Sequence, residues 1–253
     1  MEIVKKQVLV TVKAYPNPSN KYDETVCCAG IDLTNNQWVR LYPVPYRDLE
    51  ESRKFKKYSI IEINCSKTIN DKRPESFKID SDSIEVIRWI NTDKKWMERK
   101  EIVLQLPQKS MCKIISGVAL TDNSLGLIKP KDIKFDYSKK TVTPATNDYN
   151  QLTFWNQQKS KLEEIPFNFY YFFHCEGEKE CQGHRLSIID WEIGQAYRKW
   201  KEECSTEEEL LAKIQQKWLE IADTFNRDVY FYVGNMKRFR NIFMVLGVFY
   251  PPK

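Results

Sequence analysis

Two cysteines and both histidines of the chain lie within eleven residues, in the stretch HCEGEKECQGH that begins at His174. Thiolate sulfur and neutral imidazole nitrogen are the donor atoms that tetrahedral zinc prefers. Cys175, Cys181 and His184 are the predicted ligands. His174 is a candidate for the fourth position, although neighbouring residues on a strand point to opposite faces. The ligand set would be closed, so the zinc would hold a loop in place and catalyse nothing.

The alternative for this stretch is a polar hairpin tip, EGEKE, that the two cysteines merely flank. The spacing C-x5-C-x2-H is not a standard zinc-finger spacing, and no second pair of ligands follows nearby. The sequence therefore leaves open whether a metal binds.

Two acids, Asp190 and Glu192, follow shortly afterwards. On a strand they would share one face, which is an arrangement that a metal-dependent nuclease uses. At a helix start they would interact with unpaired amides and with the helix dipole. No third acid lies nearby in the sequence, so the helix start is the favoured interpretation.

Basic and aromatic residues alternate at several places. The N-terminal examples are KAY (13–15), WVRLY (38–42) and RKFKKY (53–58), and the loop KRFR contributes Lys237, Arg238 and Arg240 near the C-terminus. Cations that follow phosphates and rings that stack on bases are typical of single-strand binding. Amphipathic packing, with Trp38 in the core and the lysines as a solvated rim, is the alternative.

The elements that would position these residues follow from periodicity. Residues 7–13, 25–33, 38–43 and 58–67 have the alternation of strands, and a turn at 34–36 joins two of them into a hairpin. A short helix is expected within 46–57 and a longer one over 92–104. Residues 109–134 contain short apolar runs, and 135–150 are a connector.

The C-terminal part combines strands with a helical hairpin. Residues 167–173 form an aromatic strand that leads into His174, and strands are expected at 229–233 and 242–249. Apolar spacing predicts a helix over 190–203 and a second one beyond the capping box at Ser205–Glu208. We therefore expect two modules, residues 1–134 and 135–253.

Composition narrows the class of protein. The 253 residues carry a formal charge of +5, which is too small an excess to identify a polyanionic partner. No uncharged run approaches the length of a membrane span, so no membrane association and a cytoplasmic location are expected. Seven cysteines in a chain of this size favour a reducing compartment.

Several motifs resemble the dual OB-fold domain family of prokaryotic conflict systems. They are KAYPNPS (13–19), AGI (29–31), WVRLYPVPYR (38–47), RPES (73–76), SLGLIKP (124–130), Ile165-Pro166, the C-x-x-H element and DWE (190–192). The resemblance spans the whole chain. It implies an α+β fold with two small OB-like β-barrels and an added helical hairpin.

An OB barrel binds single strands on one sheet face and its flanking loops. By that resemblance the expected contacts are Lys13, Tyr15, Arg40, Tyr42, Arg47 and Arg73. The resemblance further implies an accessory or sensor protein of antiviral defence. The interleaved basic and aromatic residues favour a nucleic-acid-binding protein without enzymatic activity. The sequence does not distinguish DNA, RNA and a nucleotide as the ligand, and a nuclease using Asp190 and Glu192 or an adaptor for a defence effector protein stay open.

Overall fold

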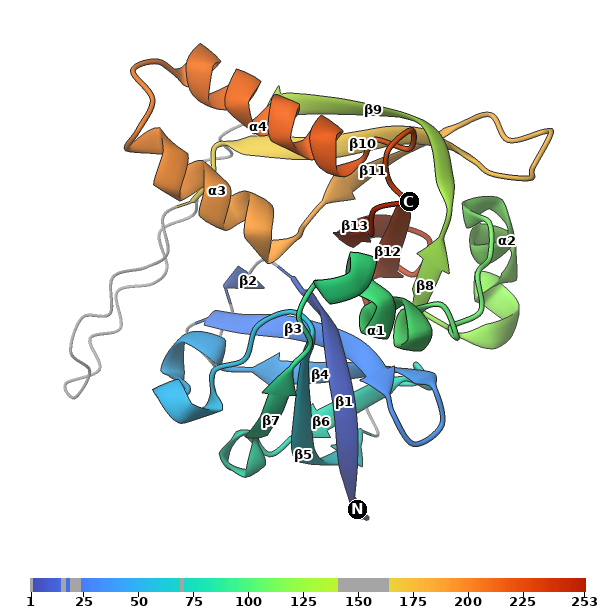
Figure 1. The fold of residues 1–253 in the computed structure, drawn as a ribbon. Helices are drawn as coiled ribbons and strands as arrows, with labels where there is room; N and C mark the ends of the chain where they lie inside the picture. Colours follow the sequence, from blue (N-terminus) through green and yellow to red (C-terminus); the bar gives the residue numbers. More distant parts are fainter. Residues whose placement is uncertain (1, 15–16, 19–23, 69–70, 141–163) are drawn as a thin grey trace.

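The computed structural model describes residues 2–14, 17–18, 24–68, 71–140 and 164–253, and Tyr15 lies outside them. The described chain is a mixed α+β fold with two sheets and four α-helices. The barrel formed by the first sheet lies on one side in Figure 1, the second sheet lies on the other, and helix α1 (Asp93–Val103) lies between them. The expected α+β class is confirmed.

The first sheet closes into a five-stranded barrel. Its strands are β1 (Ile3–Lys13), β3 (Glu24–Asp32), β4 (Gln37–Val44), β6 (Ser76–Ile79) and β5 (Ser59–Lys67), in that order. Antiparallel pairing of β1 with β5 closes the ring. The short β2 (Asn17–Pro18) pairs with β3, and β7 (Glu85–Trp89) pairs with β5 outside the ring.

Both faces of the barrel strands are buried over much of their length. Val8, Val10 and Ile61 point into the barrel core. Leu9 and Ile60, at alternate positions, pack with Tyr232 and other residues of the second sheet. Because side chains alternate along a strand, one face of these strands fills the barrel interior and the other face packs against the second module.

The second sheet is open. Its order is β8 (Leu125–Ile128), β12 (Tyr230–Asn235), β13 (Phe243–Phe249), β11 (His184–Ile188), β10 (Phe167–Cys175) and β9 (Pro130–Lys139). In the described chain β8 and β9 do not pair with each other, so the expected second barrel is not confirmed. The expected boundary at residue 134 falls inside β9, and the second sheet begins at β8.

The predicted helical hairpin consists of α3 (Trp191–Lys201) and α4 (Glu207–Ile221), which cover the second sheet in Figure 1. The capping box lies one residue later than expected: Thr206 Oγ1 accepts from the amide of Glu209, 3.1 Å away, and the carboxylate of Glu209 accepts from the amide of Ser205. The expected short helix is two 3-10 turns, η1 (Tyr46–Asp48) and η2 (Glu51–Arg53); a third, η3, spans Ser81–Ser83.

Helix α1 (Asp93–Val103) begins with a strained backbone. Lys94, Lys95 and Trp96 all have left-handed φ angles, 48°, 57° and 63°. For residues with a Cβ atom this region costs roughly 1–2 kcal/mol each, so neighbouring contacts must hold the segment. Helix α2 (Met111–Thr121) was not expected; the side chain of Ser110 caps it by accepting from the amide of Lys113.

Polar contacts join the two modules. The guanidinium of Arg40 on β4 donates to Ser124 Oγ at 2.9 Å and to the carbonyl of Asn235 at 3.5 Å. Glu75 accepts from the amide of Ser124 at 2.6 Å. All are buried, so they fix how the barrel meets the second sheet. Among the described helices, none combines the length and apolar character that crossing a membrane requires.

Candidate metal centre

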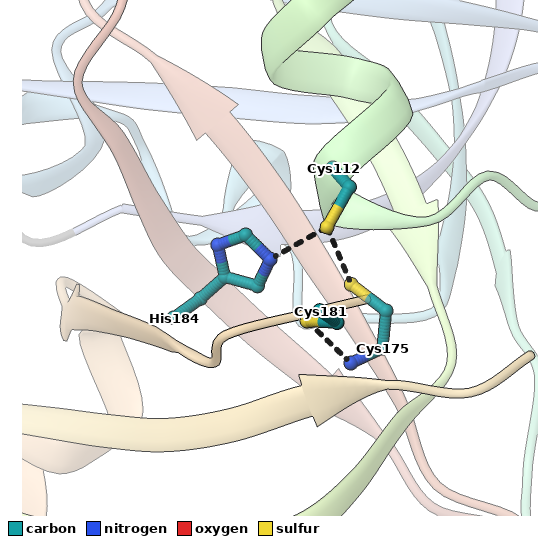
Figure 2. A group of neighbouring side chains, drawn as sticks. All are labelled: Cys112, Cys175, Cys181 and His184. Atoms are coloured by element: carbon teal, nitrogen blue, oxygen red, sulfur yellow. Dashed lines mark hydrogen bonds between the residues drawn. The ribbon is translucent and has the colours of Figure 1, made fainter. Parts of the chain in front are cut away.

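Three elements bring four donor side chains together. Cys175 ends β10, Cys181 lies in the turn that follows, and His184 begins β11. Cys112 comes from the first turn of α2, far away in the sequence. Figure 2 shows the thiols and the imidazole turned toward one another between the helix and the turn. The four donor atoms all lie within 4.8 Å of one another, so the cluster could hold a metal ion.

The distances fit a tetrahedral zinc ion. With Zn–S of about 2.3 Å and Zn–N of about 2.0 Å, tetrahedral geometry places two sulfurs about 3.8 Å apart and sulfur and nitrogen about 3.5 Å apart. Cys112 Sγ lies 3.9 Å from Cys175 Sγ and 3.3 Å from His184 Nε2. These two separations are therefore close to those that zinc requires.

Burial and mutual hydrogen bonds separate the pKa values of the three thiols. Burial, aided by Cys181 and Cys175, raises the pKa of Cys112 to about 12, and burial also raises that of Cys175. Burial acts in the same direction on Cys181, but the amides of Cys175 and Gly183 and the neighbouring thiols outweigh it and lower the pKa. Burial lowers the pKa of His184, which favours the neutral imidazole that a metal needs.

His174, the predicted fourth ligand, is not in the group, and Cys112 completes it instead. His174 Nδ1 faces Asp132 Oδ2 at 3.6 Å. The physical reason is the alternation along β10, which turns Cys175 inward and its neighbour away. Cys112 escaped notice because α2 was not recognised, although Ser110 followed by Met111, Ile114 and Val118 has the pattern of a capped amphipathic helix.

Two arginines expected to contact nucleic acid lie between the modules. Arg40 and Arg73 are 5% and 7% exposed. Arg73 binds Asp71 through a double contact, the shorter at 2.6 Å, and its Nη1 donates to the carbonyl of Asn235 at 3.2 Å. These guanidinium groups are therefore occupied by protein partners.

The other expected contacts in the barrel differ in exposure. Lys13 is 7% exposed, and its ammonium lies 3.6 Å from the ring centroid of Tyr46 and 5.0 Å from that of Trp191. Tyr42 is 47% exposed, and Arg47 is exposed at the surface. The structure thus leaves Tyr42 and Arg47 accessible and buries Lys13.

The basic loop between β12 and β13 is accessible. Lys237, Arg238 and Phe239 are exposed, while Arg240 donates to the carbonyl of Asp122 at 2.6 Å and pairs with its carboxylate at 3.0 Å. Arg240 therefore ties the loop to the end of α2, and its three neighbours project from it.

Asp190 and Glu192 lie at the start of a helix, which is the interpretation that the sequence favoured. Asp190 is the N-cap of α3 and accepts from the amide of Glu192 at 3.1 Å. Lys57 of the barrel contacts both carboxylates, at 2.6 and 3.0 Å. In the described chain, the only metal-ligand cluster of three or more groups is the one around Cys112, and these acids are not part of it.

The barrel, the open sheet and the candidate metal centre together define a two-module α+β protein. Residues 107–253, which contain the whole second sheet and the metal centre, match the family described as "Domain of unknown function (DUF8757)", and the chain belongs to that family. Residues 4–105, which contain the barrel, match "Domain of unknown function (DUF8758)". No curated protein matches the chain.

Proposed function

We propose that this protein binds single-stranded nucleic acid without catalysing a reaction, and that a zinc ion at the candidate metal centre stabilises its second module. Its five-stranded barrel supports an OB-like interpretation, and the resemblance to the dual OB-fold domain family extends the proposal to an accessory or sensor role in prokaryotic antiviral defence. An effector protein of such a system is the partner that this role would require.

The observation that carries the proposal is the contact between Arg40 and Asn235. Along β4, Val39 and Leu41 fill the barrel core, so Trp38, Arg40 and Tyr42 face outward. Trp38 meets Tyr232 of β12 with ring centroids 6.0 Å apart. Arg40, two residues on, reaches Asn235 at the end of that strand.

The next outward residue of β4 is Tyr42, and the next residues after β12 are the basic loop. Because Trp38 contacts Tyr232 and Arg40 contacts Asn235, we infer that Tyr42 lies on the side of the loop that carries Lys237, Arg238 and Phe239. We call these four residues the loop edge. Two exposed rings and two exposed cations are the combination that stacks on bases and follows phosphates.

The proposed zinc would support this arrangement from the same end of the second sheet, because His184 begins β11 beside the start of the parallel strand β13, which follows the basic loop. A closed set of three thiolates and one imidazole has no open position for substrate, so its contribution is structural. It joins α2 to the turn between β10 and β11. Arg240 in turn ties the end of α2 to the basic loop.

Titration of labelled oligodeoxythymidine and oligouridine, followed by fluorescence anisotropy, tests the proposal. We expect binding that weakens with salt. Replacing Lys237 and Arg238 by Gln should reduce the slope of log K against log salt by about 0.7 for each phosphate that is no longer neutralised. Phe239→Ala and Tyr42→Ala should each weaken binding by about 1–3 kcal/mol if the ring stacks on a base.

Matched controls lie elsewhere on the surface. Phe225, in the turn that follows α4, is 85% exposed, and Lys199 on α3 is exposed. Phe225→Ala and Lys199→Gln should leave affinity unchanged. Absence of binding at low salt, or an equal effect of the control variants, would refute the loop edge as the binding surface.

A further inference from the structure

A cavity opens where the barrel, α1 and the last strand of the second sheet meet. Its volume is about 410 Å³, and its walls include Lys56 before β5, Trp89 at the end of β7, Trp96 and Arg99 from α1, and Tyr250 just after β13. A cavity of roughly 300–1,000 Å³ suits a small organic ligand. We call it the junction cavity. It shares no residue with the loop edge.

The walls carry more positive than negative charge. Four cations, Lys13, Lys56, Lys57 and Arg99, line the cavity together with one acid, Glu192. Lys57 is paired with both Asp190 and Glu192. Within the described part of the chain, no carboxylate lies within ion-pair distance of Lys13 or Lys56. Lys56 is exposed, whereas Lys13 is buried and its ammonium contacts the rings of Tyr46 and Trp191.

Aromatic rings form the rest of the wall and are held in place. Trp89 is 48% exposed, and its indole Nε1 donates to the carbonyl of Lys57 at 3.0 Å. Trp96 packs against Tyr250 with ring centroids 4.9 Å apart. The guanidinium of Arg99 lies 4.8 Å from the Trp96 centroid and 5.3 Å from the Trp89 centroid. The rings therefore keep their orientation without a ligand.

Arg99 is held in place by contacts with Ile90 and Tyr58. Arg99 Nε and Nη2 donate to the carbonyl of Ile90 at 3.0 and 2.6 Å, and its guanidinium lies 4.0 Å from the Tyr58 centroid. Arg99 thus lies between Trp89 and Trp96 and fixes their spacing. Two of its N–H groups are already bonded to the carbonyl of Ile90.

The backbone strain at the start of α1 lies at this cavity. The three left-handed residues end at Trp96, so the strained turn sets where that ring enters the wall. Strained conformations of this kind persist where surrounding contacts hold them, and they concentrate at ligand sites. The strain is an observation independent of the charge and the exposed ring.

From these observations we propose that the junction cavity binds a ligand made of a planar heteroaromatic base and a phosphate, with the base stacked on Trp89 and the phosphate bound by Lys56 and Lys13. The ammonium of Lys56 lies over the Trp89 ring, 5.5 Å from its centroid, so a phosphate-binding group and an exposed ring occupy the same part of the wall. A ligand that joins a base to a phosphate contacts both Trp89 and Lys56, whereas a base alone or a phosphate alone contacts only one of them.

Two sources supply this chemistry: a free nucleotide and the 5′-phosphorylated end of a nucleic-acid strand. The proposal goes beyond single-strand binding at the loop edge, because the two surfaces have different residues. Failure of one leaves the other testable, since Tyr42→Ala should leave the cavity unchanged and Trp89→Leu should leave the loop edge unchanged.

Calorimetric titration of the full chain with the four ribonucleoside 5′-monophosphates tests the proposal. At least one should bind, and the matching nucleoside and inorganic phosphate should each bind at least tenfold more weakly. Trp89→Leu should weaken binding roughly tenfold or more, the scale of one base–aromatic stack. Lys56→Gln should weaken it and reduce its salt dependence. Both side chains are accessible, so the variants are expected to fold.

Lys54→Gln is the matched control for the lysine, because Lys54 lies two residues away and pairs with Glu51 outside the cavity. It should leave affinity unchanged. A 5′-phosphorylated trinucleotide that competes, where its 5′-hydroxyl counterpart does not, would assign the ligand to a strand end. Absence of binding by all four nucleotides and by the phosphorylated trinucleotide, or binding that Trp89→Leu and Lys56→Gln leave intact, would overturn the proposal.

Discussion

Lys57 Nζ lies 2.6 Å from Asp190 Oδ2, and both side chains are less than a tenth exposed. The pair joins the barrel to the N-cap of α3. Burial alone would lower the pKa of Lys57, but the carboxylates of Asp190 and Glu192 outweigh it and hold the pKa above its ordinary value. A charged pair at this position holds the modules in register.

Breaking this pair from one side should be costly. Lys57→Met leaves the carboxylate of Asp190 buried without its cation, which we expect to lower the free energy of unfolding by roughly 3–5 kcal/mol. Asp190→Asn in the same chain removes that charge and keeps a capping side chain, so the double variant should recover much of the loss. Urea unfolding of the two single variants and the double variant measures the coupling. Simple additivity of the two losses would contradict it.

Arg40 should behave as a structural residue. Arg40→Ala removes the hydrogen bonds that the guanidinium donates to Ser124 and Asn235 in the buried contact between the modules. We expect the free energy of unfolding to fall by roughly 1.5–3 kcal/mol. Arg238→Ala, on the exposed loop, is the matched arginine control and should change stability by less than about 0.5 kcal/mol. Equal effects in the unfolding curves would show that the contact contributes nothing.

The metal centre should depend on Cys112. Protein purified without chelator should contain about one zinc per chain, and Cys112→Ser or Cys181→Ser should remove most of it and lower the melting temperature. Chelation should have the same effect, because metal affinity contributes folding free energy. Elemental analysis and thermal unfolding measure both quantities.

Two residues serve as controls for that experiment. Cys204→Ser removes a half-buried thiol outside the cluster, and His174→Ala removes the histidine that faces Asp132. Both variants should retain zinc. Loss of zinc from His174→Ala with retention in Cys112→Ser would reassign the fourth ligand.

Lys13 should make stability depend on alkaline pH. Burial lowers its pKa from 10.5 to about 8, so between these values the unfolded chain holds more protons than the folded chain. The stability contributed by Lys13 therefore rises from pH 8 to pH 10.5, by about 3 kcal/mol at 1.36 kcal/mol per pKa unit. Lys13→Met, which carries no charge, should be more stable than the native chain below pH 8, and the difference should shrink as pH rises.

Urea unfolding at several pH values measures that difference. Comparing the two proteins at each pH cancels the titration of the cysteines and tyrosines that they share. A difference that stays constant from pH 7 to pH 10.5 would mean that the buried ammonium costs nothing.

Local patterns were enough to predict much of the fold. Alternation identified most strands of the barrel, and apolar spacing identified α3 and α4, because each pattern reports the face that one element buries. Closure of the barrel by pairing of β1 with β5 and the open order of the second sheet depend on contacts between distant strands. No local pattern encodes those contacts.

Three of the four members of the metal centre could be identified from the amino-acid sequence, because Cys175, Cys181 and His184 lie on one hairpin. The fourth required the folded chain, since packing of α2 brings Cys112 to a residue 63 positions away. The role of Arg40 also required the folded chain, because an arginine side chain can bind a phosphate or a backbone carbonyl. Its role depends on which surface the second module covers, and that is settled by how two apolar faces pack together.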